Sequence, residues 1–186
     1  KAGGNSQTAV GVASYADGEG SSAFGANANA TGSTATAIGR ATKAIAQSAS
    51  AFGDSASASS WGATALGVGA SARADNSIAV GSAAVTEGRE STALGRRSYA
   101  GAQSATALGT LANASAIVST AVGNGAKASA LGASALGNTA AASGRGSMAL
   151  GYASKASGVD AMASGSNASA SSMNAVAVGK DSNSSA

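Results

Sequence analysis

The chain has 186 residues, of which 44% are hydrophobic but only 3% aromatic, and it contains 27 glycines and no proline. These proportions exclude a conventional core of large interlocking side chains, so the core must consist of small residues. Histidine and cysteine are absent, and 11 basic and 8 acidic residues give a formal net charge of +3. This composition excludes disulfides, thiolate metal sites and histidine catalysis, and the charge is too weak to indicate a nucleic-acid partner.

A short motif that ends in glycine recurs along the whole chain. It is first present at Thr8–Gly11, then at Ser22–Gly25 and Thr36–Gly39, and each copy begins 14 residues after the one before. The 13 glycines that close these copies, called anchor glycines from here on, are Gly11, Gly25, Gly39, Gly53, Gly67, Gly81, Gly95, Gly109, Gly123, Gly137, Gly151, Gly165 and Gly179. Because no insertion or deletion interrupts them, we predict that residues 1–186 form a single repeat domain of about 13 coils.

Each repeat contains a second segment with the period-2 alternation that is typical of a β-strand. The third residue after each anchor glycine is small and the fifth is nearly always alanine, whereas the residue between them is polar and variable, as at Asn29 and Lys43. Turns rich in Gly, Ser, Asn and Asp, such as Asp17-Gly18 and Thr31-Gly32, join the two segments. This pattern predicts an all-β fold, a parallel β-solenoid of 14-residue coils with two short strands per coil.

The strand before each anchor glycine has two different faces. One face carries only Ala and Gly, which suit the small interior of such a coil, so the opposite face must point outward. At the position just before the anchor glycine, 12 of 13 residues are large and apolar, Ser164 being the exception. We call these residues the stripe: Val10, Phe24, Ile38, Phe52, Leu66, Val80, Leu94, Leu108, Val122, Leu136, Leu150 and Val178.

Exposure of the whole stripe to water is energetically unfavourable for a single chain. Its burial is worth on the order of 30 kcal/mol per chain, which far exceeds the stability of a typical domain. We therefore predict that another copy of the chain covers the stripe, because closed symmetry is the usual way to bury such a surface. The residues alone do not distinguish a dimer from a trimer.

The recurring Ala-aliphatic-Gly followed by x-x-Ala-x-Ala, from about Thr8 to Val178, resembles the head repeats of trimeric autotransporter adhesins. The resemblance implies a left-handed parallel β-roll and a homotrimer packed around a central apolar axis. It also implies a role in virulence at the cell surface of a Gram-negative bacterium, with an outer-membrane anchor and a stalk in regions that are not in this chain. We accordingly expect the chain to be a fragment of a longer surface protein.

Five residues stand out as a possible ligand surface: Lys43, Trp61, Tyr99, Lys127 and Lys155. Four of them lie at the outward position of the second strand, where a partner could reach them or where they could simply be solvated. Trp61 lies in a turn, where it could contact a ligand or pack over the neighbouring coils.

The leading functional hypothesis is the head of a surface adhesin that attaches to host cells or extracellular matrix through many weak contacts. The alternative is a structural spacer that projects another binding domain from the cell. A hexapeptide-type acyltransferase is disfavoured because its coil has a different length and it uses a catalytic histidine, and an ice-binding solenoid is disfavoured because apolar residues replace the second threonine. We predict no enzyme activity, no catalytic residue, no cofactor, no metal site, no nucleic-acid partner and no membrane contact by this segment.

Overall fold

A computed structural model describes residues 6–185. The chain divides into two compact units, Lys1–Ser91 and Thr92–Ala186, which are described separately. Within the described residues the secondary structure consists of short β-strands without a helix, so no helix long and apolar enough to span a membrane is present there. The prediction of a single repeat domain, whose outermost residues lie outside the described part, stays a prediction.

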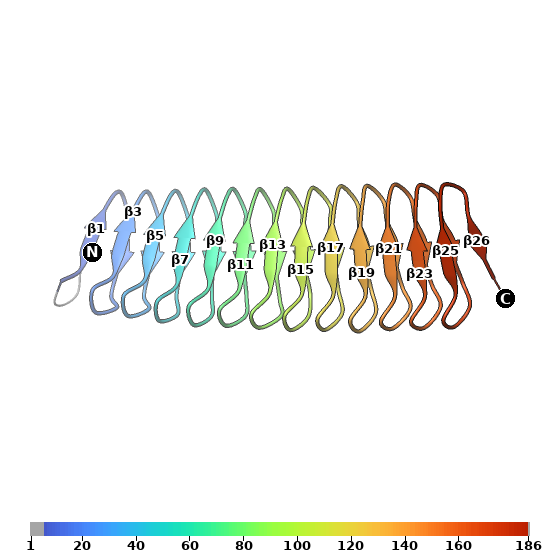
Figure 1. The fold of residues 1–186 in the computed structure, drawn as a ribbon. Coiled ribbons are helices and arrows are strands. Elements are labelled where there is room, and N and C mark those ends of the chain that lie inside the picture. Colours follow the sequence, from blue (N-terminus) through green and yellow to red (C-terminus); the bar gives the residue numbers. More distant parts are fainter. Residues whose placement is uncertain (1–5, 186) are drawn as a thin grey trace. The chain divides into compact units, whose positions relative to one another are not determined.

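The first unit contains two sets of strands. The three-residue strands are β1 (Thr8–Val10), β3 (Ser22–Phe24), β5 (Thr36–Ile38), β7 (Ser50–Phe52), β9 (Thr64–Leu66) and β11 (Ile78–Val80). The two-residue strands are β2 (Tyr15–Ala16), β4 (Asn29–Ala30), β6 (Lys43–Ala44), β8 (Ser57–Ala58), β10 (Ser71–Ala72) and β12 (Val85–Thr86). Each coil contributes one strand to each set, as Figure 1 shows.

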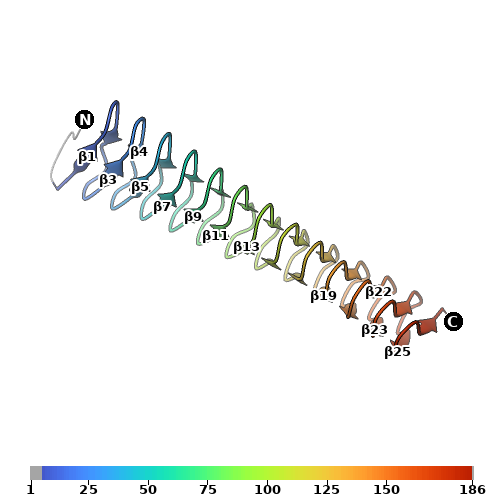
Figure 2. The ribbon, with the colours of Figure 1, turned by 90° about the horizontal axis from the view of Figure 1, so that it is seen from above.

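The second unit repeats this arrangement. Its three-residue strands are β13 (Thr92–Leu94), β15 (Thr106–Leu108), β17 (Thr120–Val122), β19 (Ser134–Leu136), β21 (Met148–Leu150), β23 (Met162–Ser164) and β25 (Val176–Val178). Its two-residue strands are β14 (Tyr99–Ala100), β16 (Asn113–Ala114), β18 (Lys127–Ala128), β20 (Ala141–Ala142), β22 (Lys155–Ala156), β24 (Ser169–Ala170) and β26 (Asn183–Ser184). The two sets lie on opposite sides of each coil (Figure 2).

Strands of the same set pair in parallel with their counterparts in the neighbouring coils. In the second unit, for example, Ala93 pairs with Ala107, and Ala107 with Ala121, so the register shift is one repeat of 14 residues. The backbone bonds between coils follow the same spacing, as when Gly109 N–H donates to the Leu94 carbonyl at 2.8 Å. The predicted all-β parallel solenoid of 14-residue coils with two strands each is therefore confirmed.

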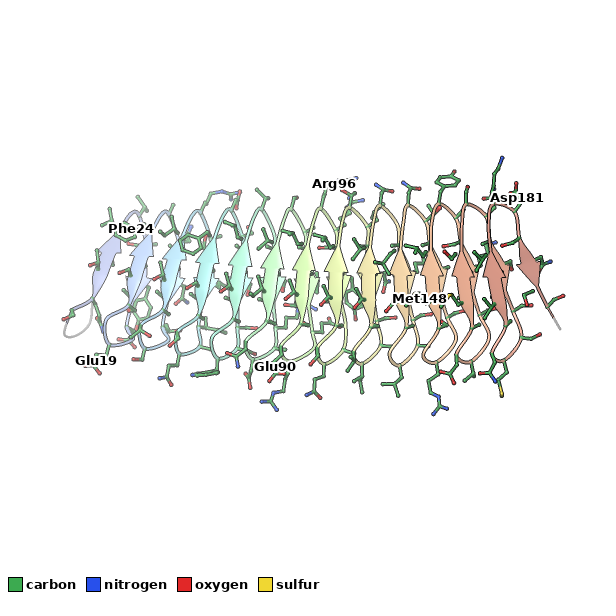
Figure 3. The ribbon with its side chains drawn as sticks, viewed as in Figure 1. Glu19, Phe24, Glu90, Arg96, Met148 and Asp181 are labelled. Atoms are coloured by element: carbon green, nitrogen blue, oxygen red, sulfur yellow. The ribbon has the colours of Figure 1, made fainter. Side chains whose placement is uncertain are left out.

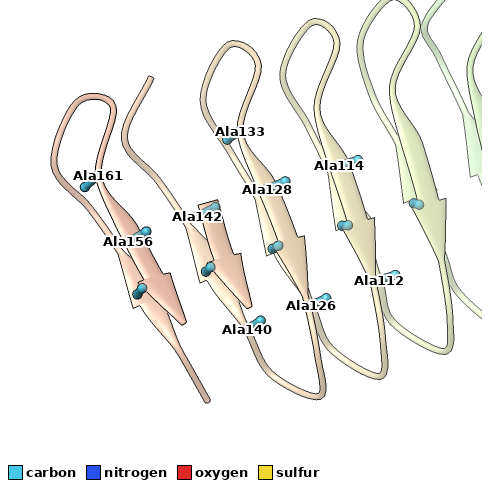
Figure 4. Packing of buried hydrophobic residues seen from close by; sticks show 14 of the residues in the cluster. Ala112, Ala114, Ala126, Ala128, Ala133, Ala140, Ala142, Ala156 and Ala161 are labelled. Carbon is cyan, nitrogen blue, oxygen red and sulfur yellow. The ribbon is translucent and has the colours of Figure 1, made fainter. Parts of the chain in front are cut away.

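The interior of each coil is filled by alanine. Every alanine just inside a three-residue strand from Ala23 onward is at most 3% exposed, and the alanines of the facing strands pack against them. Figure 4 shows Ala112, Ala114, Ala126 and Ala128 pointing into the narrow space between the two strands of their coils. A methyl group is about the largest side chain that this spacing admits, which explains why the composition is so poor in aromatics.

The few larger side chains inside the coil are hydroxyls with local hydrogen-bond partners. Thr42 Oγ1 donates to the Gly53 carbonyl at 2.6 Å, and Thr86 Oγ1 donates to Ser77 Oγ at 2.9 Å. Ser77 Oγ in turn donates to the Ala74 carbonyl at 2.7 Å. Because these hydroxyls are satisfied, they can replace alanine without the cost of an unpaired buried polar group.

Each coil turns twice through a residue in the left-handed region, at the second and ninth positions after the anchor glycine. Asn27 and Thr34 are the examples in one coil, both with φ of 57°. The sequence pattern pointed instead to Asp17-Gly18 and Thr31-Gly32 as turns, and the left-handed residues there are Gly20 and Thr34, two positions after the glycines or just beyond. The turn position is fixed by the coil closure, so it is occupied by whatever residue stands there.

Two of these turn positions hold residues that strongly disfavour the left-handed region. Val118 has a φ of 55° and is 58% exposed, and its β-branched side chain makes this conformation costly. We expect Val118→Asn to raise the free energy of unfolding by ~1 kcal/mol, because asparagine tolerates this region. The measurement is thermal unfolding followed by circular dichroism. Val68→Asn is the control, since Val68 is 59% exposed but is not left-handed; an equal gain in both variants would contradict the strain at Val118.

Candidate functional site

The outward face of the three-residue strands is apolar in both units. We call it the apolar face and define it by the first and third residues of each of these strands. The predicted stripe occupies the third position, where eight residues are exposed: Val10, Phe24, Ile38, Leu66, Leu94, Leu108, Leu150 and Val178. Phe52, Val80, Val122 and Leu136 are half-buried. All twelve predicted stripe residues thus lie outside the coil, as Figure 3 shows for Phe24.

The first position of these strands adds apolar residues that were not assigned to the stripe. Ile78 is 42% exposed, Met148 41%, Met162 39% and Val176 59%. Met162 shares its strand with Ser164, the one polar residue of the stripe position, so the apolar face continues across this coil. The sequence signal for these residues was their spacing of one repeat, but threonine and serine at the same position in most other coils concealed it.

The opposite side of the coil carries the residues predicted as a possible ligand surface. Lys43 is exposed in β6, Lys127 in β18 and Lys155 in β22, whereas Tyr99 in β14 is half-buried. Trp61 lies in the turn between β8 and β9 and is 51% exposed. The structure therefore separates Trp61 from the other four, which share one outward position, and their role in binding stays a prediction.

The turn that leads into each three-residue strand is apolar over part of the second unit. Ile117 is 50% exposed, Leu131 51% and Met173 69%, and Arg145 lies among them at the same position of its coil. Since the arginine interrupts them, these residues do not form a continuous apolar surface like that of the apolar face.

Charged side chains in the first unit pair with a partner one coil away. Arg40 binds Asp54, Arg73 lies 2.7 Å from Glu87, and Arg89 lies 3.9 Å from Asp75. Hydrogen bonds from Ser55 and then Arg40 hold the pKa of the Asp54 carboxyl below its usual value. These pairs are exposed, so each contributes little to stability.

The described part of the chain offers no enclosed site for a small molecule. Residues 6–185 contain no pocket and no group of three or more carboxylates or other acidic or imidazole ligands that could hold a metal ion. Interactions of this segment must therefore use its outer faces.

Comparison with known proteins identifies the repeat. The family model described as the YadA head domain repeat (2 copies) matches overlapping segments that together span residues 4–42 and 58–182. A solved structure, the collagen-binding domain of the Yersinia adhesin YadA, is 22% identical and aligns over 95% of this chain and 82% of that one, with a TM-score of 0.39. The comparison with curated proteins found no match. Because the family model covers most of the sequence, the chain belongs to the YadA head domain family, the head repeats of trimeric autotransporter adhesins.

Proposed function

We propose that this chain is the head of a bacterial surface adhesin, that three copies assemble through their apolar faces, and that the assembled head attaches the cell to host cells or extracellular matrix. The observation that carries the proposal is the apolar face, with Leu94, Leu108 and Leu150 each at least 40% exposed. Contiguous apolar surface of this extent is normally covered by a partner. A second and a third copy present the same face and so are suitable partners.

The number of copies follows from the family and not from the apolar face alone. Adhesins with this head are trimeric autotransporters, and three identical apolar faces around one axis can shield one another from water. The stripe residues Val10, Phe24, Ile38, Phe52, Leu66, Val80, Leu94, Leu108, Val122, Leu136, Leu150 and Val178 would then form the trimer core. The left-handed coil implied by the resemblance belongs to the same proposal.

YadA-type adhesins are surface proteins and a non-enzymatic kind of protein. We infer that this head is displayed outside a Gram-negative cell and is held at the outer membrane by a region outside the given sequence. In that arrangement the two-residue strands face away from the trimer axis and are available to host molecules. Three copies of each outer face would raise avidity without a deep pocket.

A binding assay on the assembled fragment tests attachment. The solved relative is a collagen-binding domain, so immobilised collagen, fibronectin and laminin are suitable first ligands. We expect the fragment to bind at least one of them, and a variant held as a single chain to bind far more weakly because avidity is lost. If the assembled fragment binds no matrix component or host-cell surface, the attachment role is contradicted and the spacer role is favoured.

A further inference from the structure

The outward position of the two-residue strands carries the same three side chains twice. In the first unit Tyr15, Asn29 and Lys43 follow one another on β2, β4 and β6. In the second unit Tyr99, Asn113 and Lys127 follow one another on β14, β16 and β18. We call these sets the first and second triads; they are 84 residues apart, which is six coils.

Each triad forms a compact polar group on a rigid surface. The strands are parallel and in register, so the tyrosine, amide and ammonium side chains stand in a row with steps of ~4.8 Å. Both lysines are exposed, and both asparagines are half-buried. A row of this kind presents an aromatic ring, an amide and a positive charge to one ligand.

The asparagine has the same unusual environment in both triads. Asn29 Oδ1 and Asn113 Oδ1 are buried and have no hydrogen-bond partner among the described residues. A buried polar atom without a partner is costly, so its repetition at equivalent positions calls for an explanation. A ligand hydroxyl over the triad would donate the missing hydrogen bond.

The two triads differ in what lies beside the tyrosine. A Cβ atom at Gly101 would lie 2.5 Å from the Tyr99 ring, so this ring covers the glycine. The equivalent residue in the first triad is Asp17, and its negative charge raises the pKa of Tyr15. A carboxylate at that distance repels an anionic ligand, so the second triad is the better site for one.

The second unit also has the charge that an anion requires. Residues 92–186 contain six basic and two acidic residues, and therefore a formal net charge of +4. No carboxylate occurs between Thr92 and Val159, a segment that includes the whole second triad. Arg96 and Arg97 are exposed in the turn just before Tyr99, where Figure 3 shows Arg96 pointing away from the coil. Lys155 lies two strands beyond Lys127 at the same outward position.

We propose that the second triad binds an anionic sugar unit of an extracellular polysaccharide, and that the first triad is a weaker copy of this site. The tyrosine ring packs against the apolar face of the sugar, the asparagine pairs with a hydroxyl, and Lys127 pairs with the carboxylate or sulfate. This inference rests on the proposed function, since it names the ligand class of the adhesin head. A nucleic acid is less suitable because only one aromatic side chain and a few separated cations are available.

Titration of the trimeric fragment with hyaluronan, heparan sulfate and duplex DNA at physiological salt tests this proposal. Hyaluronan carries only carboxylates and heparan sulfate also carries sulfates, so the two distinguish the source of the charge. We expect Lys127→Gln to weaken binding of the preferred polysaccharide about tenfold, the effect of one charge-assisted hydrogen bond. Arg145→Gln, which removes the same charge in the turn before β21, is expected to change it less than twofold.

A gain of binding tests the first triad. Asp17→Gly reproduces the glycine of the second triad, so in a Lys127→Gln background it is expected to restore part of the lost binding. No polysaccharide binding, an equal loss with Arg145→Gln, or equally tight binding of DNA would each overturn the proposal, and absence of the gain would overturn the first site. The mass of the fragment and its binding to matrix proteins are measured separately, so failure here is distinguishable from failure of the adhesin assignment.

Discussion

Gly109→Ala is expected to disrupt the stacking of the second unit. Gly109 has a φ of 129°, and a Cβ atom there would lie 2.6 Å from the Gly123 carbonyl oxygen of the next coil. The neighbouring atoms are backbone atoms held by the Gly123 N–H bond to the Leu108 carbonyl, so they cannot move aside without loss of the coil-to-coil bonds. We expect the free energy of unfolding to fall by ~4 kcal/mol or more. Thermal unfolding followed by circular dichroism measures this loss.

Gly132→Ala is the matched control for this clash. Gly132 has a φ of 66°, but a Cβ atom there would meet nothing within 4 Å. Only the backbone strain of ~1 kcal/mol is therefore expected. Equal unfolding temperatures for the two variants would contradict the claim that close contact between coils, and not the backbone conformation alone, requires the anchor glycine.

Leu108→Lys is expected to prevent assembly of the chain. Leu108 is 40% exposed on the apolar face of β15, between Leu94 and Val122 in the neighbouring coils. Three ammonium groups near one apolar axis would be both desolvated and mutually repelled, which costs several times the stability of an ordinary surface contact. The variant is expected to have the mass of a single chain, or to aggregate, whereas the unchanged chain is expected to be a trimer.

Leu111→Lys is the control for this substitution. Leu111 belongs to the same repeat and is 47% exposed, but it lies in the turn after β15 and not on the apolar face. We expect this variant to keep the assembled mass measured by light scattering. If both variants dissociate equally, the apolar face is not the specific interface.

Much of the fold was predictable because a 14-residue repeat without insertions leaves one solution for strand register. Alanine and glycine at fixed positions indicated the interior, and the large residue before each anchor glycine had to point outward since the coil has no room for it. The outward position of Leu94 or Leu150 followed directly from this alternation. What covers them does not follow from the alternation of one chain, so the trimer interface remains a prediction.

Other features depend on the closed coil and were not predictable from local patterns. Val118 adopts the left-handed region although valine disfavours it, because coil closure overrides local preference. The triads were overlooked because Tyr15, Asn29 and Asn113 were each ordinary at a variable position; only a comparison across six coils reveals their common order. The charge difference between the units was hidden in the net charge of +3 for the whole chain.

The most direct test of the central claim is the molar mass of the purified fragment, measured by light scattering over a dilution series together with circular dichroism. Burial of the apolar face between copies predicts a β-rich species of three times 17.0 kDa that persists on dilution. A folded, soluble single chain at all concentrations would contradict this account, because the apolar face would then be stable in water without a partner.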